Sequence, residues 1–117
     1  MIHYAQSQVG QNPERVFQFI YKELDKVSKM GRLGKFDLLC NLSNLFISPI
    51  LADKAYISDA TGPLSGAILL LGENLSKPQL EAECLALAKH LTVSPQVIED
   101  ALCNWQKSPQ EYKYFRG

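Results

Sequence analysis

The sequence predicts an all-α protein, a compact bundle of five or six short helices around a buried central helix. Apolar residues recur at helical spacing along most of the chain, and capping residues, Pro and Gly punctuate these segments. No segment alternates apolar and polar residues as a partner strand would. The 117 residues suit a single helical domain over 1–117, with 1–11 as a candidate flexible N-terminus and 108–117 as an aromatic C-terminal tail.

The first expected helix runs from about Pro13 to about Met30. Asn12 precedes it as an N-cap, and proline suits the first helical position because it lacks the N–H that would go unpaired there. The second expected helix runs from about Phe36 to about Ile47, because the residue before Pro49 disfavours helical geometry. The expected apolar stripes of the two helices are Val16, Ile20, Leu24 and Val27, then Leu38, Leu39, Leu42, Leu45 and Phe46.

The second half of the chain shows three further helical segments. Residues 50–62 do not decide between helical turns and a loop, whereas 63–71 is apolar almost throughout, so we expect its helix to be central and surrounded by others. Ser76 with Gln79 fits a capping box, and Ser94-Pro95 opens the next helix. Their expected inward faces are Leu80, Cys84, Leu87, Ala88 and Leu91, then Val97, Ile98, Ala101, Leu102 and Trp105.

The balanced net charge argues against some functions, and the local distribution of basic residues leaves one candidate binding surface. Twelve basic residues balance twelve acidic ones, which argues against a bulk polyanion binder. Basic residues nevertheless gather on the first expected helix and the loop after it, with Phe19 at their border. They form either an ordinary solvated face or a site for a partner or for phosphate. The candidates are Arg15, Lys22, Lys26, Lys29, Arg32 and Lys35.

The sequence predicts no catalytic residue, cofactor or metal. Three cysteines without a CxxC pair favour reduced thiols in the core, and the two histidines have no partner pattern. Neither a phosphate-binding loop nor a hydrolase motif is present. Glu73, Glu81 and Glu83 are too few for an oxygen-ligand metal site. The N-terminus lacks a secretory pattern and no apolar run reaches the roughly 20 residues of a membrane span, so we expect a soluble cytoplasmic protein.

Two local resemblances come from the second half of the chain. Residues 87–98 resemble a helix-turn-helix, with Thr92 where such turns commonly have glycine and with Glu99 and Asp100 where phosphates would lie. Residues 68–102, with Gly72-Glu73, the Ser-capped helix and Ser94-Pro95, resemble TerB-like helical domains. The resemblance implies a helical fold, and no family is assigned to the whole chain.

These observations favour a small non-enzymatic adaptor or regulator that docks on another protein, with a homodimer as one form. The aromatic tail and Phe19 are candidate interface residues, because tyrosine and phenylalanine are common where proteins meet. The tail candidates are Tyr112, Tyr114 and Phe115. The alternative is a nucleic-acid-associated protein that uses the basic face, and an enzyme is the third possibility.

Overall fold

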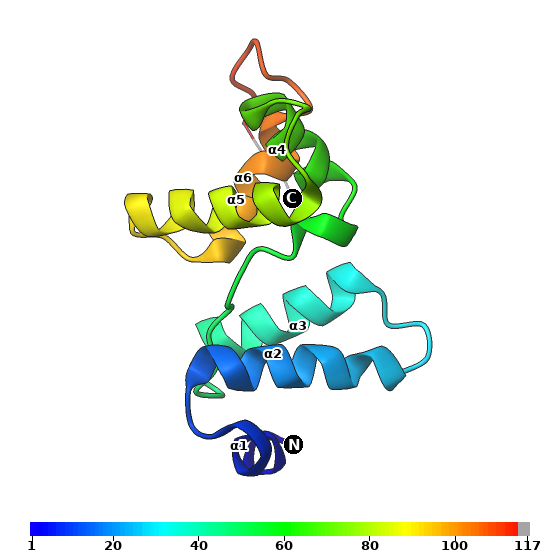
Figure 1. Ribbon diagram of the computed structural model, residues 1–117, viewed down its shortest axis with the longest axis vertical. Coiled ribbons are helices and arrows are strands. Elements are labelled where there is room, and N and C mark those ends of the chain that lie inside the picture. The colour runs from blue at the N-terminus through cyan, green and yellow to red at the C-terminus, as the bar shows by residue number, and fades with distance from the viewer. Residues whose placement is uncertain (115–117) are drawn as a thin grey trace. The chain divides into compact units, whose positions relative to one another are not determined.

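The computed structural model describes residues 1–114, and all regular structure in that range is helical (Figure 1). It comprises six α-helices and two 3-10 turns, which confirms the all-α prediction. The chain divides into an N-terminal unit, Met1–Asp53, and a C-terminal unit, Lys54–Gly117, which are described separately. The assignment of one domain stays a prediction.

The N-terminal unit is built on its second helix. Helices α1 and α3 both contact α2, and the Phe17 and Phe36 rings meet edge to face at 6.3 Å between α2 and α3. Residues 2–9, taken from the sequence as flexible, form α1. The elements are α1 (Ile2–Val9), α2 (Pro13–Glu23), η1 (Leu24–Lys26) and α3 (Arg32–Asn44). The core residues are Ala5, Val16, Phe17, Ile20, Leu24, Phe36, Leu39, Cys40 and Ile50.

Helix α2 begins as predicted but ends earlier. The Asn12 side chain accepts hydrogen bonds from the N–H groups of Glu14 and Arg15, so the N-cap is confirmed. The expected continuation to Met30 is wrong, because the chain tightens into η1 and Val27 is extended and 45% exposed. The apolar stripe therefore ends at Leu24, where the chain must turn to bring α3 against α2.

Helix α3 lies a few residues earlier than predicted and uses a different inward face. It ends at Asn44, and Phe46 takes a left-handed conformation with φ 55° and is 96% exposed. Leu38 and Leu45, expected in the apolar stripe, are also exposed. Lys35 lies inside instead, because its long aliphatic stem buries like an apolar side chain.

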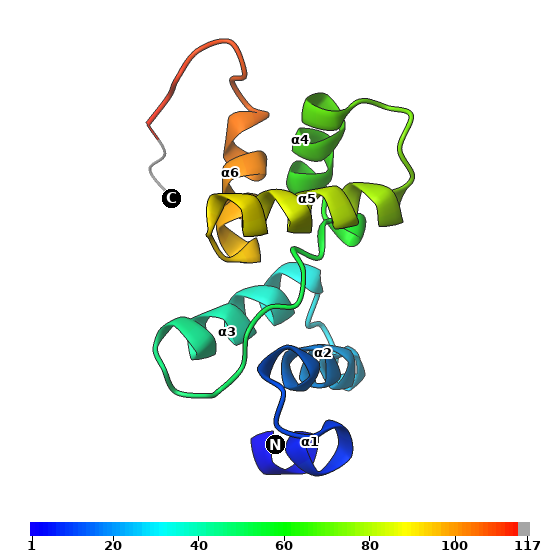
Figure 2. The same ribbon diagram turned by 60° about the vertical axis from the view of Figure 1, so that its left-hand side comes forward.

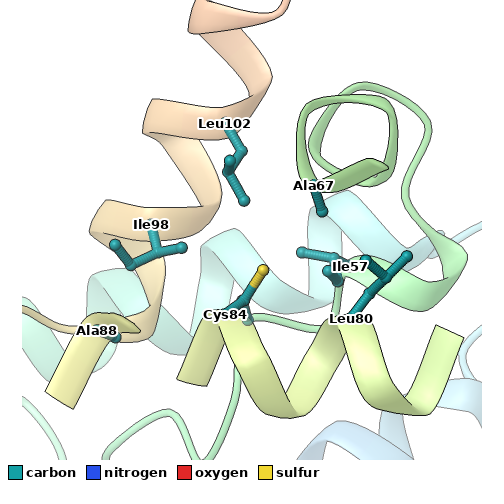
Figure 3. Packing of buried hydrophobic residues seen from close by; sticks show 8 residues of the cluster. Ile57, Ala67, Leu80, Cys84, Ala88, Ile98 and Leu102 are labelled. Atoms are coloured by element: carbon teal, nitrogen blue, oxygen red, sulfur yellow. The ribbon is translucent and has the colours of Figure 1, made fainter. Parts of the chain in front are cut away.

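The C-terminal unit packs three helices and a 3-10 turn around one apolar cluster (Figure 3). Leu80, Cys84 and Ala88 lie on one face of α5 and point toward the other elements, as their spacing predicts. Residues 50–61, which the sequence left undecided, are irregular apart from η2. The elements are η2 (Ile57–Asp59), α4 (Gly62–Leu71), α5 (Lys77–Leu91) and α6 (Pro95–Trp105).

Glycine sets the contact between α4 and α6. A Cβ at Gly66 would collide with the backbone carbonyl of Leu102, and one at Gly62 would lie 2.7 Å from the Cys103 Sγ. The helices therefore approach more closely than any side chain would allow. The expectation that α4 is surrounded on all sides is wrong for its last turn, where Leu69 is 53% exposed.

A buried carboxylate fixes the irregular segment before α4. Glu81 of α5 accepts hydrogen bonds from the backbone N–H groups of Ile57 and Ser58 and from the Ser58 hydroxyl. Its side chain satisfies backbone donors that a 3-10 turn leaves free. The carboxylate thus binds η2 to α5 and gives Glu81 a structural role.

The caps and outer faces of α5 and α6 differ in part from expectation. The Ser76–Gln79 capping box is confirmed, whereas Ser94 stands at the N-cap without a side-chain hydrogen bond. Leu91 is exposed, and only Ile98 and Leu102 are buried among the five apolar residues expected to face inward on α6, with Glu99 buried beside them. Those left largely exposed are Val97, Ala101 and Trp105.

We predict that Gly66→Ala lowers the free energy of unfolding by about 1–3 kcal/mol, because the new methyl group must displace the Leu102 backbone. Gly34→Ala in α3 is the matched control. A Cβ there meets only the end of Met30 at 3.8 Å, so the variant should gain about 0.5–1 kcal/mol. Urea unfolding of both variants provides the measurement. Equal stability of the two variants would contradict the close helix contact.

Thr92 carries a strain that glycine should relieve. It closes α5 in the left-handed region, with φ 56° and ψ 43°, where a β-branched side chain is disfavoured. Thr92→Gly should therefore raise the free energy of unfolding by about 0.5–1 kcal/mol. Thr61→Gly, at a residue with φ −83°, should bring no gain. Thermal melts of both variants test this, and a lower melting temperature for Thr92→Gly would refute it.

Candidate functional site: a cationic groove between α1 and α2

Three of the six basic candidate residues are held by neighbouring side chains. Lys26 forms an ion pair with Glu23 at 2.7 Å, and the hydrogen bond from Lys26 to that carboxylate raises the pKa of the ammonium. Lys35 pairs with Asp25 and lies 4.3 Å from the centroid of the Tyr21 ring. The Arg32 guanidinium stacks over a phenylalanine ring, 4.7 Å from its centroid. These three contacts stabilise the unit itself.

The other three side chains, those of Arg15, Lys22 and Lys29, form no ion pair or hydrogen bond within residues 1–114. Lys29 lies in the turn before α3, with φ 64°. Arg15 and Lys22 project from the exposed side of α2. Since α2 ends at Glu23, the continuous basic face expected from the sequence does not form beyond Lys22.

Arg15 and Lys22 line the same groove. The groove, called here the α1–α2 groove, has a volume of about 630 Å³. The two cations are two helical turns apart, about 10 Å along the helix axis. Phe19 lies between them and packs edge to face on Tyr4 of α1 at 5.9 Å. The lining residues are Gln8 and Val9 of α1 and Arg15, Gln18, Phe19 and Lys22 of α2.

The buried face of α2 determines this arrangement. Val16, Phe17 and Ile20 are fully buried or nearly so. Residues at the intervening helical positions must then point away from the core, which is how Arg15 and Lys22 come to project from one side. Phe19 is half buried, as the sequence predicts, since it lies at the edge of the apolar face.

The lining residues of the groove can bind an anion. They carry two positive charges, two amides and one aromatic ring, with neither a carboxylate nor a histidine among the described lining side chains. Across residues 1–114, no three His, Cys, Asp or Glu side chains form a cluster able to hold a metal ion. The groove is therefore a candidate binding site.

Sequence reasoning missed the half of this groove that α1 supplies. The sequence predicts a flexible terminus over residues 1–11, and Gln8 and Val9 are not among its candidate site residues. A signal was present, because Ile2, Ala5 and Val9 recur at helical spacing and Ala5 is fully buried. The groove forms only where this short helix meets α2.

The remaining candidates lie elsewhere. Cys40 and Cys84 are buried, as the sequence predicts, and Cys103 is half buried. Tyr112 and Tyr114 are exposed, while Phe115 lies outside the described residues. No helix within residues 1–114 has the length and apolar character needed to cross a membrane. The predictions of a protein partner and a homodimer stay predictions.

The described residues form an all-helical protein with a groove lined by Arg15 and Lys22 as a candidate binding site. The chain belongs to the family described as alpha-glutamyl/putrescinyl thymine pyrophosphorylase, clade 3, whose model matches residues 1–117. No curated protein and no solved structure matches it.

The family assignment corrects three expectations. A pyrophosphorylase family is an enzyme family, so the non-enzymatic adaptor or regulator is wrong, and nothing further favours the nucleic-acid alternative. The resemblances to TerB-like domains and to helix-turn-helix segments are also wrong as assignments. Their motifs, the capping box at Ser76 and the Ser94-Pro95 start of α6, mark helix ends of many kinds and carry no family-specific chemistry.

Burial raises the pKa of the Cys84 thiol to about 11, with the Glu81 and Glu83 carboxylates adding to the shift. The thiol then ionises in the unfolded chain at lower pH than in the folded one. The contribution of the Cys84 thiol to the free energy of unfolding is therefore fully present below pH 9. It is lost as the pH rises from 9 toward 11, by about 1.4 kcal/mol per pH unit.

Urea unfolding of the wild type and Cys84→Ala at pH 8, 9, 10 and 11 checks this prediction. The stability difference between them should shrink as the pH rises, because the variant lacks only this titration. Parallel pH curves would contradict the shift.

Proposed function

We propose that the α1–α2 groove binds the phosphate groups of a phosphorylated thymine nucleotide in the reaction of this pyrophosphorylase family. One observation supports the proposal above the others: Arg15 and Lys22, whose charges are not neutralised by any residue in 1–114, line the same groove. Surface cations that already have carboxylate partners, such as Lys26, offer no comparable charge.

The two cations complement each other as phosphate ligands. A guanidinium donates two parallel hydrogen bonds to a phosphate, whereas an ammonium acts as a compact point charge. Arg15 and Lys22 lie two helical turns apart along α2. Their spacing suits a ligand with an extended or divided phosphate group, such as a pyrophosphate or a nucleotide.

The lining between the cations suits a pyrimidine. Phe19 offers an aromatic surface against which a base can stack, and the Gln8 and Gln18 amides carry both donors and acceptors for the edge of a base. A groove for free inorganic phosphate alone would gain nothing from the ring.

The family description supplies the chemical context for this site. It joins pyrophosphate chemistry to a thymine that bears a glutamyl or putrescinyl group. A groove with free cations beside an aromatic ring would hold the phosphate and the base of such a substrate together. Binding and orientation are the roles proposed for Arg15, Lys22 and Phe19. The cytoplasmic location expected from the sequence is part of the same proposal.

Calorimetric titration of the full chain with thymidine 5′-diphosphate and with inorganic pyrophosphate tests the proposal. Arg15→Gln and Lys22→Gln should each weaken the binding of both ligands by about tenfold, because each removes a charge-assisted interaction with phosphate. Phe19→Leu should weaken the binding of the nucleotide and leave the affinity for pyrophosphate unchanged, because only the base stacks on the ring.

The matched controls are Lys26→Gln, which removes an ion-paired lysine, and Lys29→Gln, which removes a free lysine outside the groove. Both variants should bind the two ligands with an affinity within about twofold of the wild type, since surface ion pairs and distant charges contribute little to binding. An equal loss from Lys29→Gln and Arg15→Gln would mean that general charge attraction replaces a defined site.

A further inference from the structure

The loop that follows α3 in the N-terminal unit exposes a row of large apolar side chains. Figure 2 shows the chain bending in an open loop after the end of α3. Four side chains of this loop are more than half exposed, and we call them the α3-loop patch. They are Leu45, Phe46, Ile47 and Leu51. Single exposed apolar residues are normal on a monomer, whereas a contiguous group of them marks an interaction surface.

The backbone of this loop is held by hydrogen bonds, so the patch has a fixed shape. The Phe46 N–H donates to the Ser43 carbonyl at 3.0 Å. The Ile47 N–H donates to the Leu42 carbonyl, also at 3.0 Å, and the two bonds together form a Schellman motif. The Ser43 hydroxyl donates to the carbonyl of Ile50, whose side chain is buried. A partner that covers the patch therefore orders little new backbone.

Phe46 occupies the position where this motif ordinarily has glycine. Its φ of 55° lies in the left-handed region, which disfavours a bulky side chain. The ring is also almost fully exposed, so it gains no packing within its own chain. Glycine would suit both the backbone and the solvent better. Both costs are offset when another molecule covers the ring.

Charge favours a second copy of this chain as that molecule. Residues 38–52 contain no charged side chain, although 21% of the chain is charged. A two-fold contact brings a patch against its own copy, so a charge at its centre would meet a like charge. A charged partner protein would find no counter-charge in this segment. An anionic membrane surface would find no lysine or arginine there to attract it.

We propose that two copies of this chain associate through the α3-loop patch about a two-fold axis. An exposed phenylalanine presents roughly 150–250 Å², and the whole patch presents on the order of 500 Å². A symmetric contact counts the patch twice, which gives about 1,000 Å², the lower limit for a specific interface. The dimer should therefore be weak, with a micromolar dissociation constant. The proposal does not depend on the function proposed for the α1–α2 groove.

Sedimentation velocity of the full chain from about 1 to about 200 µM tests the proposal. We expect the wild type to change from monomer to dimer across this range. Phe46→Gly should raise the dissociation constant at least about tenfold, because it removes the centre of the patch. At the lowest concentration its melting temperature should rise by about 4 °C, because glycine relieves the left-handed strain. Loss of the dimer would then not result from unfolding.

Tyr112→Gly is the matched control, because Tyr112 is 87% exposed, against 96% for Phe46, and lies outside the patch. It should leave the dissociation constant within about twofold of the wild type. Ile47→Thr is a second test that keeps a β-branched side chain and leaves the left-handed residue in place. It should weaken the dimer about fivefold, because it removes apolar surface.

Three results would overturn the proposal. The first is a wild type that stays monomeric over the whole concentration range, which would assign the patch to another part of the chain or to a different protein. The second is an equal effect of Phe46→Gly and Tyr112→Gly. The third is unchanged association of Ile47→Thr.

Discussion

Burial of one face of α2 is the constraint on which the N-terminal unit and its groove depend. Phe17 lies between α2 and α3, where its ring meets Phe36, and Val16 and Ile20 complete the same apolar face. Turning α2 about its axis would expose these side chains and cost about 1.5–3 kcal/mol for each. That cost fixes the orientation of the polar side. Arg15 and Lys22 consequently face the groove, and no side chain within residues 1–114 neutralises them.

Whether a basic side chain can bind a ligand depends in this protein on whether a neighbouring carboxylate already pairs with it, more than on the number of basic residues. Lys35 is buried because its stem packs inside, its ammonium faces Tyr21 and Asp25 neutralises it. Desolvating an ammonium without such partners would be prohibitive. Once Lys26 and Lys35 have carboxylate partners, the charge left for a ligand concentrates where α1 meets α2.

In the C-terminal unit, a close backbone contact and a buried carboxylate fix how the helices pack against one another. Gly66 lets α4 lie directly on α6, and Glu81 holds the irregular segment at Ile57 against α5. The inner face of α6 packs against α4 and α5, so Asp100 and Trp105 lie on its outer face, next to the segment that follows the helix. The two units thus leave surfaces of opposite character, one cationic and one with aromatic rings and carboxylates.

The helical class, most helix starts and the buried stripe of α5 can all be predicted from the sequence. These are local properties: Asn12 and Ser76 cap their helices through their own neighbours, and helical spacing places Cys84 inside. The end of α2, the buried face of α3 and the identity of the unpaired cations within residues 1–114 depend on tertiary contacts. Those outcomes depend on residues distant in sequence, such as Asp25 beside Lys35, and no local pattern encodes such a pairing. The enzyme family came from the comparison over the whole chain, because its residues form no catalytic motif that a local search would recognise.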